Sequence, residues 1–408
     1  MPRIVTFGEI MLRLSPPGWK RFSQASSFDA IYAGGESNVA FSLANFGLDT
    51  RFVTRIPEND IGACALNALN SCGVDTNHVI RGGERLGIYF LETGAMQRGA
   101  KVVYDRAYSS MTTIMPGQID WEAAFEDVDW FHWTGVTPGL SQSAADACLE
   151  ACKAAADRGI TISSDPNYRK ALWKYGKSPA EVLPALVEYS DIVISSKFDA
   201  ETLFDIPFEE EGLWNKNPDS RTSYSAVGKA VMQRFPKVKK VISTSRGSIS
   251  ASHNTWSAML WDGKQIHTSP TYELSHIVDR VGGGDSFMAG LIYGFLTWPQ
   301  EDPMALRFAV AASALKHSVS GDTNLATVDE VMSLLHGDGS GRVSRWPLYP
   351  SPLYHRRAAT IMSGSAVAFT RALPGAESSV KLIRLSSFFL SCRIRVSNCP
   401  KADSGTAW

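Results

Sequence analysis

The fold of this chain can be predicted from Asp279-Arg280-Val281-Gly282-Gly283-Gly284-Asp285-Ser286-Phe287-Met288. Apolar residues recur after this stretch with helical spacing, so we expect a helix that begins near Asp285. Three glycines before a helix leave backbone N–H groups free at its positive end, which favours binding of an anion such as phosphate. We expect the helix dipole to keep Asp285 ionised, so that it can accept a proton from a hydroxyl that attacks a phosphoryl group. A glycine-rich turn with an Asp that merely caps a helix is the alternative.

A second motif, Gly34-Gly35-Glu36-Ser37-Asn38-Val39-Ala40, leads into another predicted helix, which Gly47 ends. Glycines at a helix entry let the backbone approach a ligand, and the Asn38 amide offers a donor and an acceptor to hydroxyls. The later motif resembles the C-terminal signature of the ribokinase-like (PfkB) carbohydrate kinases, whose usual form is Asp-Thr-x-Gly-Ala-Gly-Asp-x-Phe. Arg280 and Gly283 depart from that form. The earlier motif matches the N-terminal signature of the same family.

The resemblance covers about residues 3–345, and the order of its motifs is most like that of the 2-keto-3-deoxygluconate kinases. It implies an α/β, doubly wound, mostly parallel sheet with a small projecting β lid. It further implies a kinase that transfers the γ-phosphoryl of Mg·ATP to a sugar acid. Alternatives are a kinase of the same fold for another sugar, such as 2-keto-3-deoxygalactonate or fructose, and a weakly active sugar-acid-binding protein.

Composition excludes several other classes of protein. The chain has 408 residues and a net charge of −1, so nothing in its charge favours nucleic acid or an anionic membrane as a partner. No run of about 18 apolar residues predicts a spanning helix. Six scattered cysteines do not make a disulfide framework. We therefore expect a reduced, cytoplasmic protein. A nicotinamide dehydrogenase is disfavoured, because its glycine fingerprint belongs to the first βα unit of the fold.

Short alternating segments predict a small sheet outside the βα units. They lie within about residues 10–33 and 85–110, where breaks such as Pro16-Pro17-Gly18 separate strand-like runs. The resemblance implies that this sheet closes over the sugar and mediates a homo-oligomer. Closure would exclude water from the reaction.

The predicted site residues lie in several separate motifs. The pattern Asp165-Pro166-Asn167-Tyr168-Arg169 follows a β-branched run. Together with Arg106 of the predicted small sheet, Arg169 would place two arginines at one site, which suits a carboxylate. With the resemblance, this arrangement implies a sugar-acid site. The residues expected to bind substrate are Glu9, Gly34, Asn38, Tyr89, Tyr104, Arg106, Asn167, Arg169 and Asp322. Asp285 is the expected base, and Gly282, Gly283 and Gly284 are expected to hold the transferring phosphoryl group.

The nucleotide is expected at Thr244, Arg246, Gly247, Gly282 and Gly284. A predicted strand, Val241–Thr244, leads there into a loop of hydroxyls, glycine and a cation. Where the family usually has Asn-x-x-Glu, this chain has Ser196-Lys197-Phe198-Asp199. Asp199 is therefore the residue expected to reach Mg²⁺, through water.

The chain is expected to divide at about residue 345. Residues 1–345 form the predicted kinase domain, whereas 346–408 lack a lasting helical or strand period and contain many basic side chains. We expect an irregular C-terminal extension without a catalytic role. A basic interaction tail is the alternative.

Overall fold

The computed structural model describes residues 1–208 and 221–341. The predicted extension, 346–408, lies outside the described residues. The polar composition of 208–225 predicts a surface loop, and most of that segment lies outside the described residues too.

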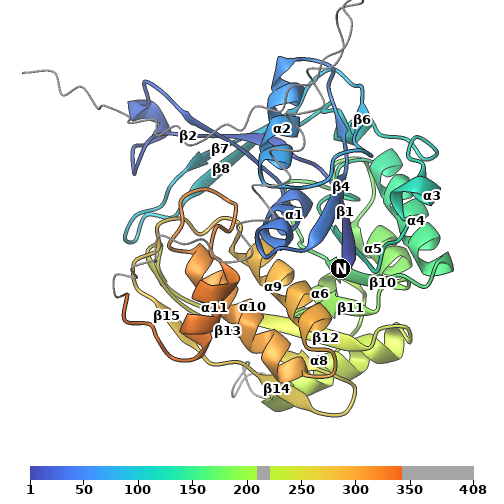
Figure 1. The fold of residues 1–408 in the computed structure, drawn as a ribbon, viewed down its shortest axis with the longest axis vertical. Helices are drawn as coiled ribbons and strands as arrows, with labels where there is room; N and C mark the ends of the chain where they lie inside the picture. Colours follow the sequence, from blue (N-terminus) through green and yellow to red (C-terminus); the bar gives the residue numbers. More distant parts are fainter. Residues whose placement is uncertain (209–220, 342–408) are drawn as a thin grey trace, which may run out of the picture. The chain divides into compact units, whose positions relative to one another are not determined.

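The central feature is a large, mostly parallel sheet (Figure 1). Neighbouring strands are parallel from β4 to β12, and antiparallel strands extend the sheet beyond β12. Across the sheet the strands are β14 (Ile266–Thr268), β13 (His253–Trp261), β12 (Lys240–Ser250), β11 (Ile192–Ile194), β10 (Thr161–Asp165), β9 (Trp130–Thr134), β1 (Arg3–Phe7) and β4 (Asp49–Val53), and β15 (Tyr272–Leu274) also pairs with β13. The predicted doubly wound α/β fold is confirmed.

A second sheet has four strands in the order β3-β2-β7-β8. These are β2 (Met11–Ser15), β3 (Asp29–Ala33), β7 (Gly87–Glu92) and β8 (Lys101–Asp105), and we call them the small sheet. All four lie within the two segments that the sequence assigns to a small sheet. A further parallel pair joins β5 (Arg55–Ile56) to β6 (Ile80–Arg81).

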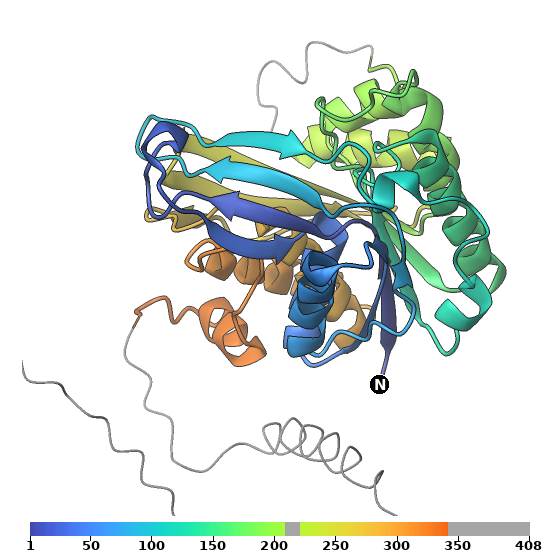
Figure 2. The ribbon, with the colours of Figure 1, turned by 90° about the horizontal axis from the view of Figure 1, so that it is seen from above.

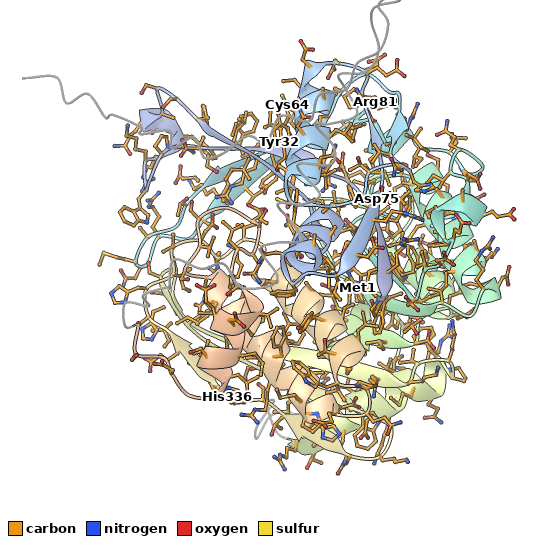
Figure 3. The ribbon with its side chains drawn as sticks, in the orientation of Figure 1. Met1, Tyr32, Cys64, Asp75, Arg81 and His336 are labelled. Carbon is orange, nitrogen blue, oxygen red and sulfur yellow. The ribbon has the colours of Figure 1, made fainter. Side chains whose placement is uncertain are left out.

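Helices cover both faces of the large sheet, which is why its strands are rich in buried β-branched and aromatic residues. On one face an apolar cluster includes residues of α3, α4, α5 and α8, and on the other it includes residues of α1, α9, α10 and α11 (Figures 1 and 2). Figure 3 shows the side chains that these helices and strands carry. The helices are α1 (Gly35–Asn45), α2 (Asp60–Ser71), α3 (Trp121–Ala124), α4 (Gln142–Asp157), α5 (Pro179–Val187), α6 (Lys197–Leu203), α8 (Arg221–Arg234), α9 (Gly283–Thr297), α10 (Asp302–Lys316) and α11 (Val328–Leu335), with short 3₁₀ turns at Phe22–Gln24 and Met111–Thr113.

Two local predictions were wrong. Residues 245–248 are not a loop, because β12 continues to Ser250 and pairs with β13 over that whole length. Residues 221–225 are helical, since α8 begins at Arg221. Within the part of the chain that the structure describes, none of the helices combines the length and apolar character that spanning a bilayer requires.

Candidate functional site

A cavity of about 670 Å³ lies where strands of the large sheet end, beside the small sheet and the first turn of α9. Ligands bind at this edge in open α/β sheets. The predicted site residues that line it are Gly34, Asn38, Tyr89, Tyr104, Arg106, Asn167, Arg169, Asp199, Thr244, Arg246, Gly282, Gly284, Asp285 and Asp322. Among the described residues, the lining does not include Glu9, Gly247 or Gly283.

The three glycines at the start of α9 differ in what a side chain would meet there. Gly282 has φ +79°, and a Cβ on it would overlap the carbonyl oxygen of Asp322. A Cβ on Gly283 would lie 2.7 Å from the ring of His317. A Cβ on Gly284 would meet nothing, because this residue faces the open cavity. The free N–H groups at the start of α9 are therefore accessible to an anion.

Asp285 lies in the first turn of α9, half-buried at the cavity wall. Its burial raises the pKa to about 7, although the Asn38 amide lowers it; Asp165 and Asp322 raise it further, and Arg169 lowers it. The helix dipole is predicted to keep this carboxylate ionised, and burial opposes that effect because it removes water from the charged form. A carboxylate with a pKa near neutrality is well matched to general base catalysis.

Asn38 connects α1 to α9 rather than pointing its whole amide at a ligand. Its Nδ2 donates to Asp285 Oδ2 at 2.7 Å, and its Oδ1 accepts from Gly34 N at 3.3 Å. The first contact orients the base, and the second fixes the glycine entry of α1.

Arg106 is already paired with an acid of this chain. Its Nε donates to Glu9 Oε2 at 2.9 Å, and Ser109 Oγ donates to the other oxygen of Glu9. Glu9 is 3% exposed and Arg106 7%. The predicted contact between Glu9 and sugar hydroxyls is thus replaced by support for Arg106, whose guanidinium lies 5.6 Å from the centroid of the Tyr104 ring.

Arg169 is the better candidate for an anion. It is exposed, and within the described ranges no carboxylate lies in ion-pair distance of it; Nη1 donates only to Tyr168 O, at 3.1 Å. The turn that carries it is set by Asn167, with φ +41°, whose N–H donates to Asp165 Oδ1 at 3.0 Å. Asp165 itself lines the cavity, a role that our sequence reasoning missed although the residue stands in the quoted motif. Burial raises its pKa to about 6, which Arg169 opposes.

Asp199 both lines the cavity and completes the capping box of α6, whose N-cap is Ser196. Its Oδ2 accepts from Ser196 N at 2.8 Å and from Ser196 Oγ at 2.7 Å. Burial raises its pKa, while those hydrogen bonds from Ser196 lower it. Asp165 and Asp199 thus present two oxygen-donor side chains to one cavity, a ligand type that suits a hard divalent cation.

Thr244 and Arg246 line the cavity from β12, where their backbones pair with β13. The Arg246 guanidinium lies 5.0 Å from the centroid of the Trp256 ring. Although Arg246 is exposed, partial loss of water around its guanidinium, together with the charges of Arg280 and Arg169, lowers its pKa to about 10. Gly247 instead packs against Thr255, whose Oγ1 accepts from its N–H at 3.2 Å.

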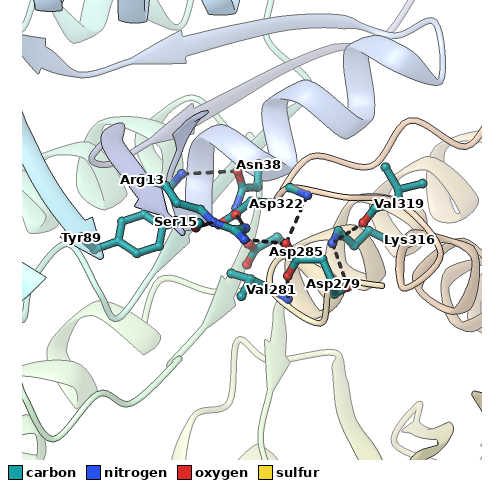
Figure 4. Close-up of polar contacts among 12 residues, drawn as sticks. Arg13, Ser15, Asn38, Tyr89, Asp279, Val281, Asp285, Lys316, Val319 and Asp322 are labelled. Carbon is teal, nitrogen blue, oxygen red and sulfur yellow. Dashed lines mark hydrogen bonds and ion pairs between the residues drawn. The ribbon is translucent and has the colours of Figure 1, made fainter. Parts of the chain in front are cut away.

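Asp322 accepts hydrogen bonds from two residues of the small sheet, Tyr89 and Arg13 (Figure 4). Tyr89 OH donates to Asp322 Oδ2, and Arg13 Nη1 donates to Asp322 Oδ1. Sequence reasoning missed Arg13, because an isolated Arg in an alternating strand carries no motif.

A family model described as "pfkB family carbohydrate kinase" matches residues 1–328. The chain is 28% identical to a 2-dehydro-3-deoxygalactonokinase of Haloferax volcanii, over 83% of this chain and 98% of that protein. It is 26% identical to a 2-dehydro-3-deoxygluconokinase of Bacillus subtilis, over 81% of this chain and 94% of that protein.

The crystal structure of a 2-dehydro-3-deoxygluconokinase from Thermotoga maritima is similar in both fold and sequence. It superposes with a TM-score of 0.77 at 42% identity, covering 83% of this chain and all of that one. The family match spans both glycine motifs, the small sheet and Asp285. This chain therefore belongs to the pfkB family of carbohydrate kinases.

Proposed function

We propose that this kinase transfers the γ-phosphoryl group of ATP to the 6-hydroxyl of 2-keto-3-deoxygluconate, the sugar acid also called 2-dehydro-3-deoxygluconate. The observation that carries the proposal is Asp285, a carboxylate with a pKa of about 7 next to the open Gly284 and the free N–H groups of α9. That arrangement combines a base with an anion site.

In the proposed reaction the sugar hydroxyl oxygen attacks the γ-phosphorus while its proton passes to the Asp285 carboxylate. The bond from the γ-phosphorus to the bridging oxygen breaks, and ADP leaves. The backbone N–H groups at Gly284 and Asp285 would stabilise the charge on the transferring group. Asn38 would keep Asp285 aimed at the cavity through its 2.7 Å hydrogen bond.

An acidic sugar is favoured by the guanidinium of Arg169 at the cavity, which pairs with no carboxylate among residues 1–208 and 221–341. Arg106 would contribute less net attraction than expected, because Glu9 matches its charge. Tyr104 and the neighbouring Tyr89 would contact the sugar from the small sheet. The name of the Thermotoga maritima relative supports the gluconate substrate. The galactonate epimer is the second candidate, favoured by the name of the Haloferax volcanii relative.

The nucleotide would lie along Thr244 and Arg246, with its γ-phosphate at Gly282 and Gly284. The Mg²⁺ that accompanies ATP would be held through water by Asp165 and Asp199, and it would offset phosphate charge. Gly247 would not touch the nucleotide, and it would instead shape the backbone next to Arg246.

We also propose that residues 1–345 carry the activity and that the protein self-associates through the small sheet. Exposed apolar side chains on or beside that sheet, Phe28, Val102 and Val103, support self-association. A cytoplasmic location is supported by the unpaired, buried cysteines Cys148 and Cys152 of α4, since reducing compartments keep thiols free.

A coupled ADP-release assay across a panel of sugars tests this function. The panel contains 2-keto-3-deoxygluconate, its galactonate epimer, fructose and ribose. We expect the two sugar acids to be phosphorylated with higher kcat/KM than the neutral sugars. A preference for a neutral sugar would refute the sugar-acid assignment, and binding without turnover would favour a binding protein.

A further inference from the structure

A buried arginine of the small sheet, Arg13, pairs with two acids that lie beside the glycine turn, Val281–Gly284. Asp279 precedes this turn in the sequence, and the backbone of Asp322 packs against Gly282. Arg13 Nη2 donates to Asp279 Oδ2 at 2.6 Å, and its Nη1 donates to Asp322 Oδ1. Exposure is 3% for Arg13 and Asp322 and 6% for Asp279. Arg13 Nε donates to Ser15 Oγ at 2.8 Å, which fixes the orientation of the guanidinium (Figure 4).

Each acid in turn fixes part of the glycine turn. Asp279 accepts from Val281 N at 3.0 Å and from Gly321 N at 3.1 Å, so it ties the turn to the segment before Asp322. The backbone of Asp322 packs directly against Gly282. Both acids therefore contact the residues that immediately precede Asp285.

The small sheet contacts this turn through more than Arg13. Arg13 and Tyr89 are register partners on the parallel strands β2 and β7, so their side chains share a face, and both donate to Asp322. Val281 packs against the apolar cluster of Met11, Tyr89 and Leu91. The substrate-facing sheet and the turn thus form one connected unit.

We propose that Arg13 is a positioning residue that couples the small sheet to the glycine turn and thereby sets the rate of phosphoryl transfer. This inference rests on the proposed kinase function. Arg13 does not line the cavity itself, so its effect would pass through Asp279 and Asp322. Its planar fork suits two carboxylates at once, which an ammonium matches less well.

Lys316 makes the inference testable in a folded protein. Its buried Nζ donates to the carbonyl oxygens of Asp279, at 3.1 Å, and Val319, at 3.3 Å. These contacts hold the backbone of the loops independently of Arg13, so we expect Arg13→Met to fold. Arg51→Met is the matched control, because Arg51 is also buried and pairs with Asp75 at 3.1 Å, away from the cavity.

The test measures kcat, KM, thermal unfolding and amide hydrogen exchange for both variants. Because small misplacements of reacting groups are costly, we expect Arg13→Met to lower kcat about 10- to 100-fold, with KM changed less than about threefold. Exchange at the Val281 and Gly321 amides should quicken. Arg51→Met should lose thermal stability too, though less, because its ion-pair partner Asp75 is 26% exposed, and it should keep kcat within about twofold of wild type, since it is remote from the reacting groups.

Arg13→Lys should recover part of the lost kcat and serves as the test variant if Arg13→Met does not fold. Equal kcat losses in the Arg13 and Arg51 variants, or unchanged kcat in an Arg13 variant, would overturn the inference. Hydrogen exchange reports on the turn without turnover, so unchanged exchange at Val281 and Gly321 would also overturn it. If wild type itself phosphorylates no sugar, the proposed function fails, whatever the exchange result.

Discussion

The side-chain amide of Asn38 donates to the carboxylate of Asp285 at 2.7 Å, across 247 residues of sequence. The contact joins the first turns of α1 and α9, which carry the two glycine motifs of the chain. It means that one motif orients the base supplied by the other. The Asn38 amide also favours the ionised form of Asp285, against burial.

Asn38→Ala should therefore raise the pKa of Asp285 above its value of about 7. Because the base acts only when ionised, the acid limb of the kcat/KM profile should move to higher pH. Asn45→Ala is the control, since Asn45 lies on the same helix and donates to Ala326 O instead. Superimposable pH profiles for wild type and Asn38→Ala would show that this hydrogen bond does not tune the base.

Asp285→Asn should change stability in a pH-dependent way. The folded pKa of about 7 exceeds the ordinary value of 3.8, so the folded state binds a proton more tightly than the unfolded state. The resulting stability is present below the unfolded pKa and is lost as pH rises through the folded pKa. The difference in Tm between the variant and wild type should therefore be more favourable to the variant at about pH 8 than at about pH 5. An offset in Tm that is the same at both pH values would contradict the raised pKa.

Gly282→Ala and Gly284→Ala should fail in different ways. At Gly282, φ is +79° and a methyl would overlap Asp322, so we expect a loss of stability of about 1–3 kcal/mol. At Gly284 a methyl meets no protein atom and projects where the phosphoryl group would lie, so Tm should hold while kcat/KM for ATP falls. Thermal unfolding and steady-state kinetics on both variants separate the two effects. Equal losses of Tm would argue against an open approach at Gly284.

Arg169→Ala should damage use of a sugar acid far more than use of a neutral analogue. Once the small sheet and a bound sugar acid cover Arg169, its removal leaves the substrate carboxylate unpaired, which costs about 2–5 kcal/mol, or roughly 30- to several-thousand-fold in kcat/KM. Arg106→Ala should instead lower stability by about 3–5 kcal/mol, because Glu9 would remain buried without its partner. Kinetics with both sugars and unfolding of both variants check this. Equal loss for acid and neutral substrates in Arg169→Ala would make Arg169 structural.

Much of the fold follows from local sequence signals. The helix α4 begins after Ser141, whose side chain accepts from Ala144 N, and α11 begins with a capping box from Thr327 to Glu330. Glycines at positive φ, such as Gly47 and Gly282, mark the ends and starts of helices. These signals lie within a few residues of the structure they specify, so one sequence is enough to recognise them.

The parts that sequence reasoning missed depend on contacts across long separations. Nothing near Glu9 reveals that Arg106 pairs with it, and nothing near Arg13 reveals Asp279 or Asp322. The pKa of Asp285 depends on how completely the cavity wall excludes water, which no motif encodes. The extension of β12 through Arg246 is likewise set by pairing with β13.

The most direct test of the central claim compares wild type and Asp285→Asn in phosphoryl transfer from ATP to 2-keto-3-deoxygluconate, with the product identified by ³¹P NMR. We predict that wild type forms the 6-phosphate and that the variant, with a similar KM, turns over about 10²- to 10⁴-fold more slowly, the range for loss of a general base. Turnover by the variant within a few-fold of wild type would contradict the role of Asp285. Absence of any phosphorylated sugar acid from wild type would contradict the proposed function itself.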